Sequence, residues 1–364
     1  MLSARPLDGI FVVDLTSNVA APFASAVLAD LGATVVHVEG PSGDDCRRMA
    51  PVRGESSAYF EVVNRGKQTM RSDIRTASGR AALDDLLRDA DVFVTNLRPG
   101  KLAGLGLDAD ALGASHPRLI HAALSAYGPT GPERDKPGYD AVLQARTGIA
   151  AVTGTPDGSP VRAGVSILDV GAGTWLALGV ITALYERERT GSGGAVATSL
   201  FEAGASWVAY HVAAHQVSGE PSRRHGSGHP AFSPYGIFAT GDGSICLGIG
   251  GDGLFARLCE AIDRPDLATD PRFATNADRS AHADDLRIEL ERTFSQAPAT
   301  AWAQRLGDAG LPIDAVQQPE DLLLDPQADR TGILIDLPGT DLRVPGLPIT
   351  FDDVRPQPTD PRID

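Results

Sequence analysis

The sequence predicts an α/β protein with a large open Rossmann-like domain and a smaller α/β domain. The chain has 364 residues, 42% of them hydrophobic and 22% charged, which is ordinary globular composition at a length that favours more than one domain. Its first forty residues have the pattern of a strand, a helix and a second strand. A polar stretch rich in glycine, His215–Pro230, later interrupts the regular pattern and indicates a linker.

The N-terminal pattern is a βαβ unit of nucleotide-binding type. Ile10–Leu15 is an apolar run that predicts a buried strand, and Val19–Leu31 predicts a helix with Pro22 in its first turn, where proline is tolerated. Ala33–Val38 predicts the second strand. The turn between the first strand and the helix reads SNVAAP and lacks GxGxxG, so the sequence does not favour a dinucleotide site.

Further strands and helices follow with the spacing of an α/β domain. Asp91–Gly100 predicts a strand and a turn that carries Asn96 and Arg98. Ser78 is a candidate N-cap for the predicted helix Gly79–Arg88. The other elements predicted for this domain are helices at Gly79–Arg88, Trp175–Arg189 and Phe201–Gln216 and strands at Arg118–Ala123 and Gly194–Leu200.

We predict a smaller domain after the linker. Phe238–Gly250 reads as a hairpin with an Asp-Gly turn, and Leu254–Ile262 reads as a helix. The predicted division is residues 1–218 for the first part of the large domain, 219–230 for the linker, 231–325 for the small domain and 326–364 for a segment that returns to the large domain.

Composition and charge exclude several classes of function. The net charge of −15 and the lack of a long basic stretch argue against nucleic acid or an anionic membrane as partner. Three cysteines without a CxxC pair argue against a zinc site, and we interpret His211 and His215 as helix packing residues, so no metal is expected. The N-terminus lacks the apolar core of a signal peptide and no apolar run is judged long enough to span a bilayer, so we expect a cytoplasmic protein.

One acid stands out at a helix start. The apolar run Val165–Leu168 meets Asp169, and small residues that begin a helix follow. Asp169 is either an N-cap, which would stabilise the helix by about 0.5–2 kcal/mol, or a reacting group. Basic residues gather near predicted strand ends, among them Arg47, Arg65 and Lys67. Each alone reads as a solvated side chain, but their grouping favours a phosphate-binding role.

Nine motifs in order along nearly the whole chain carry a family resemblance. They are PLDGIFVVDLT, APFASAVLADLGATVVHVE, NRGKQT, NLRPGKLAGLGL, SAYGPTGP, GYDAVLQARTG, VRAGVSILDVGAGTWLALGVITALYERERTG, SPYGIFATGDGSICLGIG and DPRFATNADR. By these motifs the chain resembles the family III CoA-transferases, which include formyl-CoA transferase, the carnitine-related CoA-transferase and the α-methylacyl-CoA racemases. The resemblance implies an interlocked homodimer.

The resemblance implies a reaction and a set of residues. Asp169 matches the transferases' nucleophile, which moves CoA from an acyl-CoA to a small carboxylic acid, so CoA is expected as substrate and no cofactor as a permanent ligand. Tyr139, which stands just before the Asp of the GYD motif, is expected at the catalytic site with Asp169. Gly250 and Gly251, with Gly248 and Gly253, match the mobile glycine segment of the transferases. The residues expected at CoA are Val19, Ala20, Arg47, Lys67, Asn96, Leu97, Arg98 and Lys101. Lys67 and Arg98 match the family pattern, whereas Arg47 and Lys101 are chosen for their charge.

Two alternatives stay open. A racemase of this family would carry histidine where Tyr139 stands and glutamate where Gly251 stands, because a base must abstract the α-proton. A CoA-binding protein without catalysis is the other alternative, since two arginines that contact CoA in formyl-CoA transferases fall on Gly40 and Gly104 and the tail is short. Val19, which replaces a glutamine of those enzymes, argues against formyl or oxalate specificity.

Overall fold

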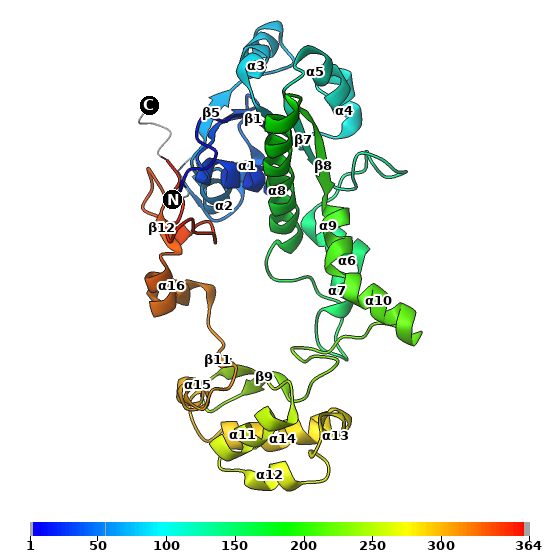
Figure 1. The fold of residues 1–364 in the computed structure, drawn as a ribbon, viewed down its shortest axis with the longest axis vertical. Coiled ribbons are helices and arrows are strands. Elements are labelled where there is room, and N and C mark those ends of the chain that lie inside the picture. The colour runs from blue at the N-terminus through cyan, green and yellow to red at the C-terminus, as the bar shows by residue number, and fades with distance from the viewer. Residues whose placement is uncertain (1–2, 55, 360–364) are drawn as a thin grey trace. The chain divides into compact units, whose positions relative to one another are not determined.

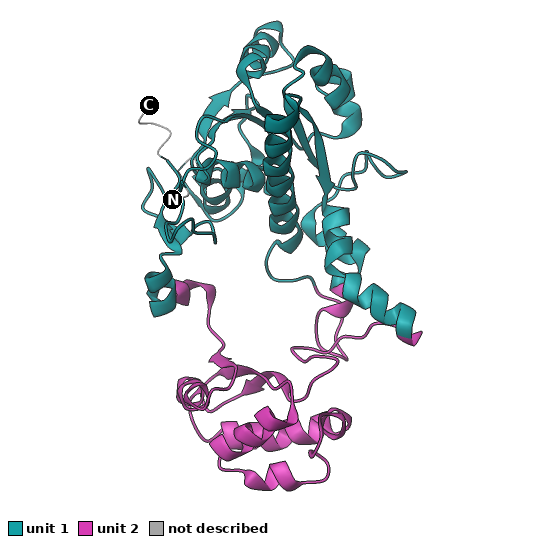
Figure 2. Cartoon of the chain, in the orientation of Figure 1, with its two compact units in different colours: residues 1–149, 162–217, 323–364 teal, residues 150–161, 218–322 magenta. Residues whose placement is uncertain are grey.

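The computed structural model describes residues 3–54 and 56–359, which divide into two compact units. The first unit comprises residues 1–149, 162–217 and 323–364, and the second comprises residues 150–161 and 218–322 (Figure 2). The short segment 150–161 thus belongs with the second unit although it precedes the longest helix in the chain.

A parallel six-stranded sheet is the framework of the first unit (Figure 1). Its strands are β1 Phe11–Leu15, β2 Thr34–Glu39, β5 Gln68–Arg71, β6 Val92–Thr95, β7 Ile120–Ser125 and β8 Gly194–Ser199. They lie in the order β5-β2-β1-β6-β7-β8, and every neighbouring pair is parallel. Counted within this sheet the order is 3-2-1-4-5-6, the order of the Rossmann fold, so the topology is present without its glycine fingerprint.

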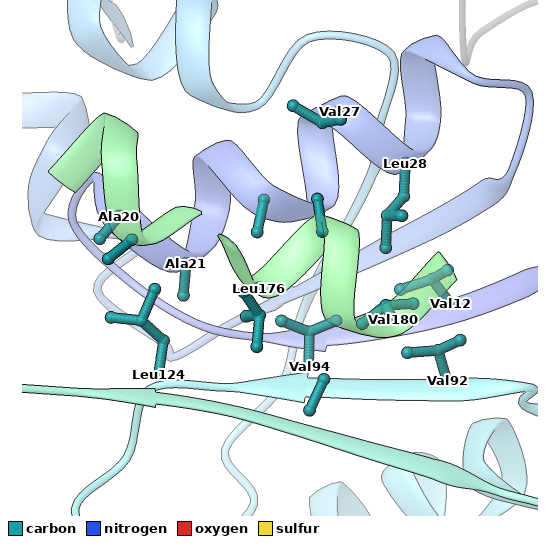
Figure 3. Close-up of a cluster of buried hydrophobic side chains, with 14 of the residues drawn as sticks. Val12, Ala20, Ala21, Val27, Leu28, Val92, Val94, Leu124, Leu176 and Val180 are labelled. Atoms are coloured by element: carbon teal, nitrogen blue, oxygen red, sulfur yellow. The ribbon is translucent and has the colours of Figure 1, made fainter. Parts of the chain in front are cut away.

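Alternate residues of the strands face opposite cores. Val12, Val92 and Val94 point to one side, where they pack with α1 Ala20–Asp30 and α8 Ile167–Thr190 (Figure 3). Val13 and Phe93 point to the other side, which α3 Ala77–Asp89, α4 Pro99–Leu105 and α5 Ala109–Ser115 cover. Because both faces of the sheet are covered, its central strands read as continuous apolar runs.

The close contact between α1 and α8 depends on a small residue. A Cβ atom at Gly173 would lie 2.5 Å from the carbonyl oxygen of Ala20. Any side chain at this position would therefore push the two helices apart, which would disturb the core beneath them.

Helix α8 corrects one expectation. By length and composition it is the one helix of the described residues that could cross a membrane, with a mean hydropathy of 1.7, so the expectation that no apolar run is long enough was wrong. Its buried residues, among them Leu168, Leu176 and Val180, pack on α1 and the sheet. We therefore interpret α8 as the core helix of the first unit.

Several boundaries also differ from the predictions. Helix α8 begins at Ile167, before the predicted start at Trp175, and already contains Asp169. Thr76, rather than Ser78, caps α3. The predicted helix at 201–216 is two helices, α9 Leu200–Trp207 and α10 Ala209–Ser218, and α10 has no buried residue. His211 and His215 therefore do not pack into a core of the described chain.

The remaining elements of the first unit are short. They are η1 Asp45–Arg48, β3 Val52–Arg53, β4 Ser56–Ser57, α2 Ala58–Val63, α6 Asp140–Thr147, α16 Pro326–Thr331, β12 Leu334–Asp336 and β13 Arg343–Pro345. Helix α7 Ile149–Val152 and η2 Pro319–Leu324 lie where the chain passes between the units.

The second unit is a three-stranded antiparallel sheet packed with helices. Its strands, β9 Tyr235–Ala239, β10 Ser244–Gly248 and β11 Ile313–Ala315, include the predicted hairpin. Its main helices are α11 Asp252–Ala261, α12 Pro265–Thr269, α13 Asn276–Ala281, α14 Ala283–Phe294 and α15 Ala299–Asp308.

Candidate functional site

A cavity of about 650 Å³ opens at the carboxyl edge of the parallel sheet, within the first unit. It lies where the strand order reverses between β1 and β6, the place where open α/β sheets bind ligands. Six of the predicted site residues line it, namely Val19, Ala20, Asn96, Arg98, Tyr139 and Asp169.

The two turns at this edge hold each other in place. The side-chain amide of Asn96 donates to the carbonyl of Ser17 at 2.7 Å and accepts from the Ser17 N–H at 3.1 Å. The next residue, Asn18, has a φ of 69° and donates its N–H to Asp44 at 3.1 Å. These bonds set the path of the chain into α1, whose N-cap residue Val19 has no side-chain bond to the helix. The uncapped first turn of α1 therefore faces the cavity.

A buried charged cluster lies behind the β1 turn and includes Lys67. The Lys67 ammonium donates to Asp14 at 2.9 Å, to the Pro22 carbonyl at 2.8 Å and to Asn64 at 2.7 Å, which uses all three of its hydrogens. Its side chain is fully buried. The structure therefore does not bring Lys67 to the cavity, and its placement indicates a structural role where CoA binding was expected.

The other predicted CoA contacts also lie elsewhere. Arg47 pairs with the buried Glu39 and stacks on Phe60, with the guanidinium carbon 3.6 Å from the ring centroid. Leu97 lines a separate apolar cavity of about 240 Å³, and Lys101 is exposed on α4. The charge of Arg47 and Lys101 was their only signal, and charge alone does not show where a long side chain ends.

Asp140 shapes the start of α8. It is the first residue of α6, and its carboxylate accepts from the N–H groups of Leu168 at 2.8 Å and Asp169 at 3.3 Å. The N-cap position of α8 itself, Ser166, makes no side-chain cap. Asp140 therefore does from another helix what an N-cap residue does locally. Asp169 lies inside the first turn, so the cap role considered for it belongs to Asp140.

Gln144 braces this arrangement. Its side-chain amide donates to the second carboxylate oxygen of Asp140 at 2.5 Å and accepts from the Ala163 N–H at 2.8 Å. Gln144 is fully buried, and both ends of segment 163–169 are thereby tied to α6. We call Asp140 and Gln144 the α6 brace. Sequence reasoning missed Gln144, although its i, i+4 spacing from Asp140 would place the two side chains on one face of a helix.

Asp169 is partly buried at the cavity wall. Burial raises its pKa, and the negative charge of Asp140 raises it further, to about 7. Within the described residues its carboxylate has no hydrogen-bond donor and no cation as partner. Such an acid is about half ionised near neutral pH, and neither oxygen is blocked by a bond that an incoming group would have to break.

Tyr139 lies beside the acids. It is the N-cap residue of α6, its side chain is 68% exposed, and its hydroxyl has no partner among the described residues. Its ring is available to whatever enters the cavity.

Three cations that sequence reasoning did not single out line the cavity together with Arg98. They are Arg134, Lys136 and Arg162. The first two lie in the loop that precedes Tyr139, where Arg134 pairs with Asp135 at 3.3 Å and Lys136 with Glu133 at 3.0 Å. A glycine- and proline-rich loop after a strand was the available signal, since such loops often carry function.

The predicted glycine segment lies in the second unit. Added Cβ atoms at Gly250 and Gly251 would meet nothing within 4 Å, and Gly251 is extended at φ −171°. Nothing in the described chain therefore requires glycine at these two positions. At Gly248, by contrast, an added Cβ would lie 2.9 Å from the Tyr235 ring, so that glycine is explained by local packing.

The site as a whole combines an unpaired carboxylate with positive charge along a cavity at a helix N-terminus. An anionic ligand with several charges can be neutralised by the four cations and by backbone N–H groups. The carboxylate can act as a nucleophile or as a base, because its pKa lies near neutrality.

Comparison with known proteins identifies the family of the chain. The model of CoA-transferase family III matches residues 7–363. Acetyl-CoA:oxalate CoA-transferase of Acetobacter aceti is 37% identical over 364 residues, which cover 99% of this chain and 93% of that protein. Human succinyl-CoA:glutarate CoA-transferase is 31% identical over 339 residues, covering 93% and 77%. The crystal structure of a CAIB/BAIF family protein from Brucella suis has a TM-score of 0.89 at 35% identity and covers 97% of this chain and 94% of its own. The chain belongs to CoA-transferase family III.

Proposed function

We propose that this CoA-transferase moves CoA from an acyl-CoA thioester to a free carboxylic acid through covalent intermediates on Asp169. The observation that carries the proposal is the state of the Asp169 carboxylate. It lies at the wall of a cation-lined cavity with no donor or cation bound to it among the described residues, and the α6 brace holds its backbone. A buried acid kept without a partner is costly, so a chemical role explains its presence better than a structural one.

The reaction that we propose balances in four steps. The carboxylate attacks the thioester carbon, the C–S bond breaks, and CoA leaves as thiolate with the electron pair, which forms a mixed anhydride on Asp169. The thiolate attacks the aspartyl carbonyl and releases the first acid, leaving an aspartyl-CoA thioester. The acceptor carboxylate attacks the aspartyl carbonyl of that thioester, the C–S bond breaks, and CoA leaves as thiolate from a second anhydride. The thiolate then attacks the acyl carbon of this anhydride, the bond to the aspartyl oxygen breaks, and the new acyl-CoA and the free Asp169 carboxylate result.

The chain's own groups support each requirement of these steps. The α6 brace fixes the Asp169 backbone at the start of α8, where the helix macrodipole offsets part of the charge repulsion from Asp140. The uncapped start of α1 and the cations Arg98, Arg134 and Lys136 are proposed to hold the phosphates of CoA. Tyr139 is proposed to contact the acyl group, since its exposed ring borders the same cavity.

An exchange assay tests the proposal. Labelled acetate, propionate or succinate is incubated with its own CoA ester, and label transfer is measured by mass spectrometry. We expect Asp169→Asn to lower transfer by roughly 10³-fold or more, because an amide forms no anhydride. The matched control is Glu186→Gln on the exposed side of the same helix, which should transfer CoA like the wild type. Equal rates for Asp169→Asn and the wild type would overturn the proposal.

A racemase is the second candidate, because an acid with a pKa of about 7 is also suited to abstract a proton. The test is deuterium exchange at the α-carbon of a branched acyl-CoA in heavy water without an acceptor acid. Exchange that depends on Asp169, in the absence of CoA transfer, would favour the racemase.

We also propose that the chain works as a homodimer, interlocked as the resemblance implies. The support is apolar surface that the described chain leaves open. On α8 it comprises Val170, Trp175, Leu178 and Tyr185, and α10 has no buried residue. Large exposed apolar surfaces mark interfaces. Light scattering should give a dimer mass, and a monomer that transfers CoA would contradict this. A cytoplasmic location stays a prediction.

The names of the relatives suggest a class of acid but not a single substrate. Oxalate, succinate and glutarate, which occur in the names of the relatives, are dicarboxylic acids of different length. Oxalate therefore belongs in the acid panel, although the residues that differ from formyl-CoA transferases argue against it.

A further inference from the structure

Two cations of the cavity form ion pairs and two do not. Arg134 and Lys136 each pair with a neighbouring acid. A hydrogen bond from Gly100, followed by Arg134 and Arg98, lowers the pKa of Asp135, so Arg98 also lies in the field of that carboxylate. Arg98 and Arg162 form no ion pair with any described residue, and the one side-chain hydrogen bond of Arg162 goes to the adjacent carbonyl of Ala163 at 3.0 Å.

The position of Arg162 also differs. Arg98, Arg134 and Lys136 belong to the turn after β6 and the loop after β7, on the sheet edge. Arg162 instead precedes Ala163, whose N–H is held by Gln144, at the start of the segment that ends in Asp169. Because the α6 brace fixes this segment at both ends, Arg162 is anchored relative to the reacting carboxylate and not to the sheet edge.

Arg162 and Asp169 line the same cavity but do not pair with each other. Burial and Asp140 account for the raised pKa of Asp169, with no cation among the causes, so Arg162 shares the cavity without pairing with Asp169. A substrate that reacts at Asp169 and extends toward Arg162 would meet a guanidinium with most of its donors free. The group that a guanidinium binds best, with two parallel hydrogen bonds, is a carboxylate.

We propose that this enzyme acts on dicarboxylic acids and their CoA monoesters, and that Arg162 binds the carboxylate that does not react. The inference rests on the proposed function, since it assigns the far end of the substrate whose near end reacts at Asp169. Arg162 is thus a specificity residue: it pairs with the distal charge of donor or acceptor and takes no part in the covalent steps. The acids Asp140 and Asp169 repel an anionic substrate, and Arg162 offsets that repulsion on the same side of the cavity.

The test compares acids that differ only in the distal charge. Succinate and glutarate are offered as acceptors beside their monomethyl esters, with acetyl-CoA as donor. We expect the wild type to prefer the free diacids. Arg162→Gln should lower kcat/KM for the diacids by about 10- to 100-fold, the usual loss for a charged hydrogen-bonded pair, and change the esters by less than about three-fold. Arg162→Lys should keep part of the preference.

Arg134→Gln is the matched control, an arginine of the same cavity on the sheet-edge side. It should raise the KM for acetyl-CoA with every acceptor alike and leave the ratio of diacid to ester unchanged. Borohydride trapping of Asp169 with acetyl-CoA, which has no distal charge, should be the same in Arg162→Gln and the wild type and so shows that the fold is intact.

Two outcomes overturn the inference alone: equal kcat/KM for diacids and esters in the wild type, or an equal loss for both in Arg162→Gln. In either case CoA transfer and trapping of Asp169 persist, and the proposed function stands. Absence of transfer to every acid together with an untrapped Asp169 would instead overturn the proposed function, and this inference with it.

Discussion

Two acids of the first unit, Asp14 and Asp169, are both shielded from water, but the charges around them are of opposite sign. Burial alone would raise the pKa of Asp14, but Lys67 and His37 outweigh burial and hold it well below its usual range, with Ser25 donating at 2.5 Å. Burial also raises the pKa of Asp169, and there the one charged group among the described residues that shifts it further is another acid, Asp140. An acid whose surroundings neutralise it supports the fold, whereas an acid whose surroundings leave it unpaired is available for chemistry.

The same contrast applies to the cations. Lys67 is saturated by three acceptors behind the β1 turn, where it supports the site without touching it. Arg162 lines the cavity with no carboxylate partner among the described residues. In the sequence, Lys67 and Arg162 are each a single basic residue within a motif. Their expected roles differ because the fold places an acid beside Lys67 and no paired acid beside Arg162.

The largest effect that we expect is on stability. Lys67→Met should lower the free energy of unfolding by about 3–5 kcal/mol, because it leaves Asp14 buried without its main cation. Asp169→Asn should instead raise the free energy of unfolding by about 1 kcal/mol at pH 8, because the substitution removes a poorly solvated charge beside Asp140. Urea unfolding measures both, with the exposed Lys101→Met as control, expected within about 0.5 kcal/mol of the wild type. Equal losses in Lys67→Met and Asp169→Asn would contradict the contrast.

A smaller effect concerns His37, which lies between Asp14 at 3.4 Å and Asp44 at 3.6 Å. Burial alone would lower its pKa, but the two carboxylates raise it above 6.5. A raised pKa contributes stability that is fully present below pH 6.5 and is lost as the pH rises through the folded value. At pH 6, His37→Gln should be about 1–2 kcal/mol less stable than the wild type, and this difference should shrink toward alkaline pH. The exposed His225→Gln should show no such trend, and a difference for His37→Gln that grows with pH would refute this reading.

The smallest effect that we expect is a displacement of the pH–rate profile. If Asp169 reacts as the anion, kcat/KM of the wild type rises with pH through about 7. Asp140→Asn removes the like charge, so the midpoint should move to lower pH while activity at pH 8 falls by less than about ten-fold. Asp110→Asn, an exposed acid on α5, is the control and should leave the midpoint in place. A midpoint that is unchanged in Asp140→Asn would show that Asp140 does not set the ionisation of Asp169.

The sequence predicted the framework and the position of Asp169 at the cavity better than the positions of the basic residues. Strands such as Ile10–Leu15 were recognisable because a strand covered on both faces is continuously apolar. Asn96 and Arg98 were placed correctly because carboxyl ends of parallel strands meet at one edge. Lys67 was misplaced because its partner Asp14 is 53 residues away in the chain, and no local pattern reveals that pairing.

The α6 brace shows a different limit. Asp140 and Gln144 are neighbours on one helix, and their spacing was readable. Their partners, the backbone N–H groups of Ala163, Leu168 and Asp169, were not, because any residue type supplies an N–H. The start of α8 was predicted too late for the same reason: its cap comes from another helix, so the usual N-cap signal is absent at Ser166.

The most direct test of the central claim is to trap the covalent intermediate. The protein is incubated with acetyl-CoA, quenched with borohydride or hydroxylamine and digested, and the peptides that contain residues 164–187 and Asp140 are analysed by mass spectrometry. The account predicts that Asp169 carries the reduced or hydroxamate product, that omitting acetyl-CoA abolishes it, and that Glu186 and Asp140 stay unmodified. Rapid CoA transfer with Asp169 unmodified under these conditions would contradict the account.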